Sequence, residues 1–482
     1  MPQLTIVGLG PGSLKQLTCE AWEVLTSAGE IWVRTGRHPI VAQLPPSIRV
    51  HSFDSVYEET PTFDEIYAII TDRVLELAAR AEGVIYAVPG HPMVGESTVA
   101  RLRARAADLG LPVRLVDGLS FIEPSLSALH VDALDGLQIV DALDLVTLNH
   151  PPLNPDFPAL VGQVYSRNVA SNLKLVLMNQ YPDEHPVALV SAAGTDMEVV
   201  QQLALYEIDH DEPTALTSLY LAPLPAVAGF EGFQETVARL RSPEGCPWDR
   251  EQTHASLRNS LLEESYEVLA AIDAEDSQAL CEELGDLLLQ IVLHAQIAVE
   301  EGEFQMPDVI AAIDAKMKHR HPHVWGATEV GGVADVLTNW EAIKHRERQD
   351  AGNAERSLLD GVPSALPALA QAQAYGERAA RVGVGRQGES EAHADLHAVL
   401  RQFGQDLAPE NRALAVGRLL LAVVNLARCW GLDAESSLRE VNARFAQRFR
   451  ALEAAALQQA TDIGALPGAA PAELWDCSRE LS

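Results

Sequence analysis

The helical half of this chain is decided by one stretch, residues 261–288, which reads LLEESYEVLAAIDAEDSQALCEELGDLL. Apolar residues recur in it every three or four positions, the spacing of amphipathic helices. The pattern predicts two helices, Ser256–Asp273 and Ser277–Glu301. Only residues 274–276 link them, and so short a link forces an antiparallel helical hairpin.

The hairpin brings four acidic residues level with one another in pairs. Glu267 and Glu283 each lie eight residues from the turn centre at residue 275, and Glu264 and Asp286 each lie eleven from it. Equal distances from a turn give equal heights along the two helices. The acids therefore form two facing pairs, one helical turn apart.

A helical wheel of about 100° per residue directs these acids toward the groove between the helices. The four acids flank two apolar stripes that are expected to pack there, and Glu263 lies further round the same side. The stripes are Leu257, Leu261, Val268 and Ile272 in the first helix, and Leu280, Leu284, Leu287 and Ile291 in the second.

Converging carboxylates would repel one another and take up protons unless a cation lay among them. Oxygen ligands select hard cations, and magnesium held by carboxylates and substrate phosphates is the usual arrangement. Such ions polarise an α-phosphate and lower the pKa of an attacking water. A solvated acidic helix face is the competing interpretation, because the chain is rich in acids.

The composition restricts the partners of the chain. Its 482 residues are too many for one ordinary core and predict roughly two to four domains. Acids outnumber bases 68 to 35, and the net charge of −33 opposes binding to nucleic acid polymers and anionic membranes. A nucleotide would be repelled too, unless metal ions lay between the carboxylates and the phosphates.

Neither a disulfide framework nor a cysteine zinc site is predicted. The five cysteines, at positions 19, 246, 281, 429 and 477, are far apart and form no CxxC pair. The first residues, MPQLTIVGLGPG, lack the basic start and apolar run of a signal peptide. No apolar run is long enough to span a membrane. We therefore expect a cytoplasmic protein.

Residues 1–222 alternate in the manner of an α/β domain. Helical stretches at Asp64–Ala81 and Ser97–Leu109 lie between short apolar runs of β character, with turns rich in glycine and proline. This order predicts a mainly parallel sheet covered by helices. The expected strands include Leu4–Val7, Val84–Val88, Val113–Val116, Leu173–Met178 and Val187–Val190.

The remainder is predicted to be all α-helical, beginning at Phe233 after a proline-rich linker at 223–232. Residues 415–424 (AVGRLLLAVV) repeat residues 283–292 (ELGDLLLQIV) at an offset of 132, with Ala415 in place of Glu283 and Arg418 in place of Asp286. The predicted layout is a helical module at 233–348, a linker at 349–366, a degenerate second copy at 367–460 and a tail at 461–482.

Four ordered motifs closely resemble the MazG-type nucleoside triphosphate pyrophosphohydrolases. They are Gly245–Asp249 (GCPWD), Leu262–Val268 (LEESYEV), Glu282–Leu288 (EELGDLL) and Arg320–Val324 (RHPHV). The family signature, EExxE followed by ExxD across a helical hairpin, is intact. The resemblance implies hydrolysis of ribo- or deoxyribonucleoside triphosphates to monophosphate and pyrophosphate, as house-cleaning of the nucleotide pool, by a dimer or higher homo-oligomer.

The resemblance also implies a role for each site residue. The metal ligands, for magnesium or manganese, would be Glu264, Glu267, Glu283 and Asp286. Glu263 would be a further ligand or would orient the attacking water. The residues that contact the substrate would be Lys316 and Arg320 on the phosphates, Trp340 on the base, and Lys344 and Asn259 beside it.

Simpler interpretations compete with some of these roles. Lys316 and Arg320, four residues apart, could form an ordinary solvated basic face, and Trp340 could be a core residue. The histidines of His319–His323 could suggest zinc, but Pro322 interrupts them and no cysteine lies near. The degenerate copy would serve as a structural partner to the first.

The N-terminal half resembles the tetrapyrrole methylase superfamily in five ordered motifs. These are Gly8–Gly12, His38-Pro39, Tyr86–Val94, Asp117–Ser120 and Ser191–Thr195. The resemblance implies a two-lobed α/β domain that binds S-adenosylmethionine between its lobes, lined by Gly10, Gly90, Pro92, Gly118 and Ala193. His91 stands where many members have an aspartate, so methylation and binding without catalysis both stay open.

Three functions are compatible with these patterns. The first is a pyrophosphohydrolase, the second a methyltransferase assembled by its helical half, and the third a nucleotide-sensing scaffold without catalysis. The intact acid set favours the first, because a scaffold does not need two pairs of metal-ready carboxylates.

Overall fold

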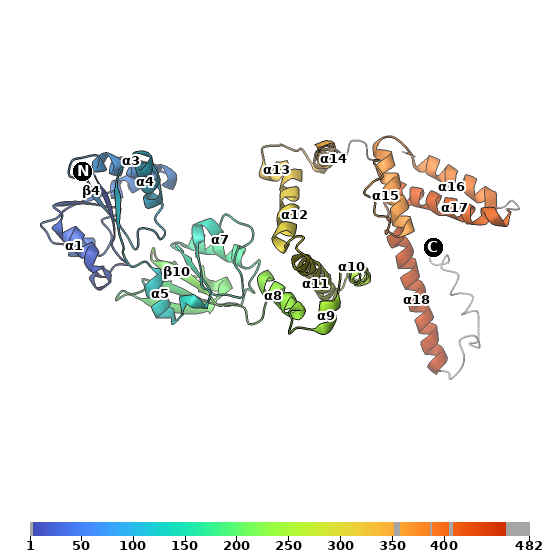
Figure 1. The fold of residues 1–482 in the computed structure, drawn as a ribbon, viewed down its shortest axis with the longest axis horizontal. Coiled ribbons are helices and arrows are strands. Elements are labelled where there is room, and N and C mark those ends of the chain that lie inside the picture. The colour runs from blue at the N-terminus through green and yellow to red at the C-terminus, as the bar shows by residue number, and fades with distance from the viewer. Residues whose placement is uncertain (1–2, 351–356, 386–387, 404–407, 459–482) are drawn as a thin grey trace. The chain divides into compact units, whose positions relative to one another are not determined.

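The fold is taken from a computed structural model that describes residues 3–350, 357–385, 388–403 and 408–458. Contacts divide the chain into two compact units, Met1–Glu251 and Gln252–Ser482 (Figure 1). The predicted tail at 461–482, with Cys477, lies outside the described residues.

The first lobe of the N-terminal unit is a parallel sheet with helices on both faces (Figure 1). Alternate residues of each strand face opposite sides, so Leu4 and Ile6 pack against one group of helices while Val7 packs against α1 (Cys19–Ser27). The first group is α3 (Phe63–Ala78) and α4 (Ser97–Asp108). The strand order is β3-β2-β4-β1-β5, from β1 (Leu4–Gly8), β2 (Glu30–Val33), β3 (Arg49–Ser52), β4 (Val84–Val88) and β5 (Val113–Val116).

The second lobe contains a mixed sheet, ordered β6-β7-β10-β8-β9. Only β6 and β7 are parallel, and the other neighbours are antiparallel. The expected parallel arrangement therefore holds for the first lobe and not for the second. The strands are β6 (Gln138–Asp141), β7 (Ala159–Gly162), β8 (Pro186–Ser191), β9 (Val199–Ala204) and β10 (Thr217–Leu221).

One expected strand, Leu173–Met178, is wrong, because these residues lie at the end of helix α7 (Arg167–Leu177). The hydroxyl of Ser166 accepts a hydrogen bond from the Val169 amide and caps the helix start. The buried residues then recur at helical spacing, which a short apolar run cannot reveal. They are Val169, Ala170, Leu173, Val176 and Leu177.

The predicted hairpin of the C-terminal unit is confirmed as α10 (Arg258–Asp273) and α11 (Ser277–Glu301). A second hairpin, α16 (Glu389–Phe403) and α17 (Pro409–Cys429), packs in the same way. Shifting Ser277 by the predicted 132 residues gives Pro409, the first residue of α17. The second helices of the two hairpins thus begin at equivalent positions, as a duplication would require, although α17 ends before the position equivalent to Glu301.

The remaining helices of the C-terminal unit are α12 (Met306–Arg320), α13 (Pro322–Trp325), α14 (Val333–Asp350), α15 (Ala368–Arg381) and α18 (Ala434–Gln458). Two further helices, α8 (Phe230–Arg241) and α9 (Pro247–Glu251), belong to the N-terminal unit. Within the described part of the chain, no single helix is long and apolar enough to cross a bilayer. One sharply bent pair, α17 with the first part of α18, meets that length and composition only when joined.

Three glycines allow the ends of β1, β4 and β5 to meet. A Cβ on Gly118 would lie 2.4 Å from the carbonyl oxygen of Gly90 and 2.8 Å from the carbonyl carbon of Gly8. A Cβ on Gly8 would lie 2.6 Å from the same Gly90 oxygen. Backbone therefore fills the space that a side chain would need.

We expect Gly118→Ala to destabilise this edge of the sheet by about 1–3 kcal/mol, the usual result of overpacking. Hydrogen exchange of the β1, β4 and β5 amides in the full chain measures the loss. Gly29→Ala is the matched control, because a Cβ there meets nothing within 4 Å. Equal protection in the two variants would contradict the close packing.

Candidate active site

The turn that sets the height of the acids is held by local contacts. The carboxylate of Asp276 accepts hydrogen bonds from the amides of Gln278 and Ala279, both at 3.0 Å, and so caps α11. Such a cap contributes about 1 kcal/mol. Glu275 adopts the left-handed conformation, with φ of 53°, which reverses the chain within the three-residue link.

The seam between the two helices runs through the acids. In α10 the half-buried Glu264 lies on the same stripe as the buried Leu257 and Ala271, and in α11 Glu283 lies between the half-buried Leu280 and Leu287. The positions in the first helix are seven residues apart, and those in α11 alternate by three and four residues, both of which are spacings of a coiled-coil seam. Glu264 and Glu283 therefore lie within the packed stripe rather than beside it.

The predicted stripes are wrong at three positions. Ile272, Leu284 and Ile291 are 50%, 48% and 43% exposed. Both helices carry apolar residues on two faces. The helical wheel therefore pointed to a direction between those two faces and not to the face that packs. The structure shows which face forms the seam, because that depends on the partner helix.

Three of the predicted ligands converge. Glu264, Glu267 and Glu283 each place a carboxylate oxygen within 4.8 Å of the other two. Asp286 and Glu263 lie outside this group of three, although both are close enough to act on Glu264 as charges. We call Glu264, Glu267 and Glu283 the acid cluster.

Two members of the acid cluster, Glu264 and Glu283, resist ionisation. Partial burial, followed by the hydrogen bond with Glu267 and the charge of Asp286, raises the pKa of Glu264 above its ordinary value. Partial burial and the charge of Glu267 raise the pKa of Glu283 in the same direction. A cation among these carboxylates would relieve the repulsion. An all-oxygen donor set of this kind fits magnesium or manganese.

The structure places the predicted phosphate and base residues in contacts that do not include the acid cluster. Arg320, at the end of α12, forms a two-point ion pair with Glu347 of α14, with N–O distances of 2.7 and 3.2 Å. The Lys344 ammonium lies 3.8 Å from the ring centroid of Trp340. Neither contact involves the acid cluster. Lys316 and Asn259 are exposed.

The His319–His323 segment does not gather metal ligands. His321 Nδ1 lies 2.7 Å from the Met317 carbonyl oxygen, so a backbone group occupies that nitrogen. Pro322 begins α13 and redirects the chain. No set of three converging ligands forms there in the part of the chain that the structure describes.

The second hairpin has lost every acid that the first one carries in its two facing pairs. At the offset of 132, the equivalents of Glu264, Glu267, Glu283 and Asp286 are Leu396, Val399, Ala415 and Arg418. Three of these replacements are apolar, and Ala415 is buried. The second hairpin therefore packs through the seam that the first hairpin uses for carboxylates.

In the N-terminal unit, the predicted glycines meet at the carboxyl ends of the strands. Gly10 and Gly90 exchange two backbone hydrogen bonds, at 2.9 and 3.1 Å. The loop after β1 also reaches the second lobe, because a Cβ on Gly12 would lie 3.6 Å from the Thr195 methyl group. The loops carrying Gly10 and Ala193 thus lie close together, while Pro92 is buried in the loop after β4.

His91 has a structural explanation. Its Nδ1 accepts a hydrogen bond from the Met93 amide at 3.0 Å, and its Nε2 lies 3.4 Å from a carboxylate oxygen of Asp117. The imidazole therefore links the loops after β4 and β5.

Two buried polar atoms lie beside the glycine turn, and the sequence analysis assigned neither a role, although it included His38 in a motif. His38 is 7% exposed, and its Nε2 lies 3.0 Å from the Gly10 carbonyl oxygen, while its Nδ1 has no partner among the described residues. Burial lowers the pKa of His38 to about 4, so the ring is neutral at pH 7. The side-chain oxygen of Gln16 is also buried without a partner. No spacing signal marks either residue.

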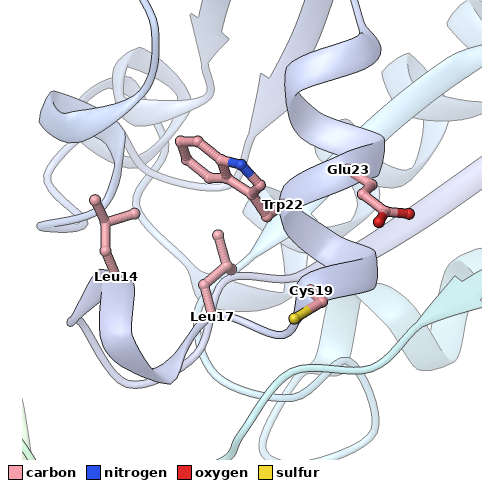
Figure 2. Close-up of a pocket in the computed structure, with 5 residues that line it drawn as sticks. All are labelled: Leu14, Leu17, Cys19, Trp22 and Glu23. Atoms are coloured by element: carbon pink, nitrogen blue, oxygen red, sulfur yellow. The ribbon is translucent and has the colours of Figure 1, made fainter.

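A surface pocket of the N-terminal unit is lined by other residues. Figure 2 shows Leu14, Leu17 and Trp22 around a shallow pocket of about 390 Å³, with Cys19 and Glu23 at its side. None of the predicted cofactor-lining residues contributes to it.

The two units thus define a protein with an α/β domain of two lobes followed by a helical carboxylate module. Comparison with known families agrees. The model of the "MazG nucleotide pyrophosphohydrolase domain" matches residues 252–325, and that of the "Tetrapyrrole (Corrin/Porphyrin) Methylases" matches residues 3–209.

Relatives match both halves. The chain is 38% identical over 488 aligned positions to the "Uncharacterized protein YabN" of Bacillus subtilis (strain 168), covering 99% of this chain and 98% of that one. It is 43% identical to the "Nucleoside triphosphate pyrophosphohydrolase" of Escherichia coli (strain K12), covering 45% of this chain and 83% of that one. The uroporphyrin-III-C-methyltransferase structure from Thermus thermophilus covers 46% of this chain and 92% of that one, at 21% identity and a TM-score of 0.36.

The chain belongs to the MazG nucleotide pyrophosphohydrolase family, with a tetrapyrrole methylase domain ahead of the MazG domain. It is accordingly a hydrolase that acts on acid anhydrides.

Repulsion within the acid cluster predicts a pH-dependent effect of Glu264→Gln. Because the folded-state pKa of Glu264 is raised, stability that is present at low pH is lost as the pH rises through that pKa. Without metal, we expect the variant to unfold at a higher temperature than wild type at pH 7. This difference in unfolding temperature should vanish below about pH 4, where Glu264 of the wild type is protonated and, like the glutamine of the variant, carries no charge.

Thermal unfolding with a chelator, followed from pH 4 to 8, measures this effect. Glu282→Gln is the matched control, because Glu282 is exposed on α11 beside the acid cluster and should shift less. A wild type more stable than Glu264→Gln at pH 7 without metal would show that the carboxylates do not repel.

Proposed function

We propose that the chain hydrolyses nucleoside triphosphates, ribo or deoxy, to nucleoside monophosphate and pyrophosphate with magnesium. The observation that carries the proposal is the acid cluster, in which three carboxylates converge at the seam of a rigid hairpin. House-cleaning of a cytoplasmic nucleotide pool is the proposed role. The strongly acidic surface argues against nucleic acid polymers and membranes as partners.

Each acid has a proposed task. Glu264, Glu267 and Glu283, with Asp286 at the next rung, would hold one or two divalent ions. Bound magnesium would supply charge stabilisation at the α-phosphate and a more acidic water. Glu263 lies on the same helix but outside the converging group, so it is the candidate to orient the attacking water and accept its proton.

The basic residues would act on the leaving pyrophosphate. Lys316 is exposed and available on α12. The ion pair with Glu347 uses two of the three Arg320 nitrogens, so a phosphate would bind through Nη1 or compete with the Glu347 carboxylate for the other two. Trp340 would pack on the base, and Lys344 and Asn259 would contact the nucleotide at its rim. A single ring with few polar neighbours would give loose base selection.

We further propose a homo-oligomer. The hairpin exposes large apolar side chains on the faces away from its seam, which a monomer would leave in water. These are Leu262, Leu269, Ile272, Leu284, Leu288 and Ile291. The hydrolase module proposed here spans 233–348, with the degenerate copy at 367–460 as its structural partner.

Glu267→Gln should lower kcat/KM for nucleoside triphosphates by about 100-fold or more, because one charged ligand is worth several kcal/mol at the metal. A panel of ribo- and deoxyribonucleoside triphosphates with magnesium, scored for monophosphate and pyrophosphate, measures this. Glu282→Gln is the control and should retain activity. Release of diphosphate and free phosphate would overturn the reaction class.

We also propose that the N-terminal domain binds S-adenosylmethionine. The family match at residues 3–209 supports this. The site also fits a cofactor with polar hydrogens, since His38 Nδ1 and the Gln16 oxygen are buried acceptors without partners among the described residues. Gly10, Gly90, Pro92, Gly118 and Ala193 would line the site. Methyl transfer would require that the turn with His91 supports the reaction in place of the aspartate that many family members have there.

Equilibrium dialysis of the full chain with labelled S-adenosylmethionine tests the cofactor proposal. We expect saturable binding, weakened about tenfold in His38→Phe by loss of one buried hydrogen bond. His130→Phe, at an exposed position outside the glycine turns, is the control. Absence of binding at millimolar ligand would remove the cofactor from the account.

A further inference from the structure

A second set of ligating side chains closes the open end of the α10–α11 hairpin. His254 lies in the turn before α10, while Glu301 ends α11 and Glu303 follows it. One ligand atom from each of these three residues lies within 4.8 Å of the other two. The set shares no residue with the acid cluster and lies at the opposite end of the helix pair from the turn.

A fourth residue fixes the ring of His254. His254 Nδ1 and His294 Nδ1 are 2.7 Å apart, and the rings are nearly parallel, with an interplanar angle of 9°. At that distance one of the two nitrogens carries the proton and the other accepts it. When His254 is the donor, its Nε2 presents a lone pair to two carboxylates.

That lone pair and those carboxylates are arranged so that one cation could bind to all three. His254 Nε2 lies 3.9 Å from a carboxylate oxygen of Glu303, too far for a hydrogen bond but suited to two ligands on one ion at about 2.0–2.2 Å each. A metal-bound histidine characteristically donates its other ring N–H to a neighbour, which holds the tautomer. His294 is placed to accept that proton.

We propose that His254, Glu301 and Glu303 bind a divalent transition metal of the zinc class, with His294 as the residue that orients His254. An imidazole beside two carboxylates selects zinc or cobalt over magnesium. Both glutamates are exposed, so their side chains can turn inward to complete the site.

A metal bound at this site would cross-link two segments of the hairpin. It would join the segment before α10 to the end of α11, while residues 274–276 already join the other ends. With both ends tied, the spacing of the helices, and hence of Glu264 and Glu283 at the seam, would be fixed. The inference is independent of whether the acid cluster hydrolyses nucleotides.

Cobalt is the probe, because its visible absorption, weak for the aqueous ion, shifts and strengthens into a distinct band when side-chain nitrogen and oxygen atoms replace water. The parent is the full chain with Glu264→Gln and Glu267→Gln, stripped of metal by a chelator, so that the acid cluster does not compete. We expect one Co²⁺ per chain with a visible band, displaced by Zn²⁺. Adding His254→Gln should remove the band, and Glu303→Gln should weaken the affinity about tenfold or more.

His393→Gln is the matched control. His393 lies 3.8 Å from the Glu389 carboxylate, a spacing like that of His254 and Glu303, but no third ligand converges there among the described residues. Cobalt binding should be unchanged in this variant. No cobalt band in the parent at millimolar Co²⁺, or an unaltered band in both His254→Gln and Glu303→Gln, overturns the proposal. Glu303 is exposed, so its substitution tests the site even if His254→Gln does not fold.

Discussion

The fold of the first helical hairpin brings carboxylates close enough to repel one another, and the properties of the site follow from this repulsion. A three-residue link, capped by Asp276, holds two helices in one register, and that register forces Glu264, Glu267 and Glu283 together at the seam. Carboxylates in a packed seam oppose folding unless protons or cations neutralise them. The raised pKa values of Glu264 and Glu283 are the direct expression of this constraint. The proposed affinity for divalent cations would then be a consequence of how the hairpin is built.

The second hairpin has a similar pair of helices without the converging carboxylates. Its two helices begin within one residue of the equivalent positions, yet apolar residues replace three of the four acids. Its seam can therefore pack without a cation. The N-terminal domain follows a comparable logic at the carboxyl ends of its parallel strands, where Gly8, Gly90 and Gly118 let backbone approach backbone. In both units, residue size and charge at a few crowded positions decide what the site can bind.

Much of this was readable from the sequence, for identifiable reasons. The hairpin was predicted because a three-residue link leaves two long amphipathic helices one arrangement, and α11 begins and ends as expected. The strand expected at Leu173–Met178 failed because a six-residue apolar run has no period long enough to distinguish strand from helix. The stripes failed at Leu284 and Ile291 because both faces of α11 are apolar. His38, His254 and Arg320 have partners distant in sequence, which no spacing rule reveals.

The central claim is that the seam of the first hairpin holds divalent cations between level carboxylates. A crystal structure of the full chain with Mn²⁺ and a non-hydrolysable nucleoside triphosphate analogue tests it most directly. The account predicts anomalous manganese density bounded by Glu264, Glu267 and Glu283, with the phosphates on its open side. Manganese bound elsewhere, with these three side chains turned apart into solvent, would contradict it.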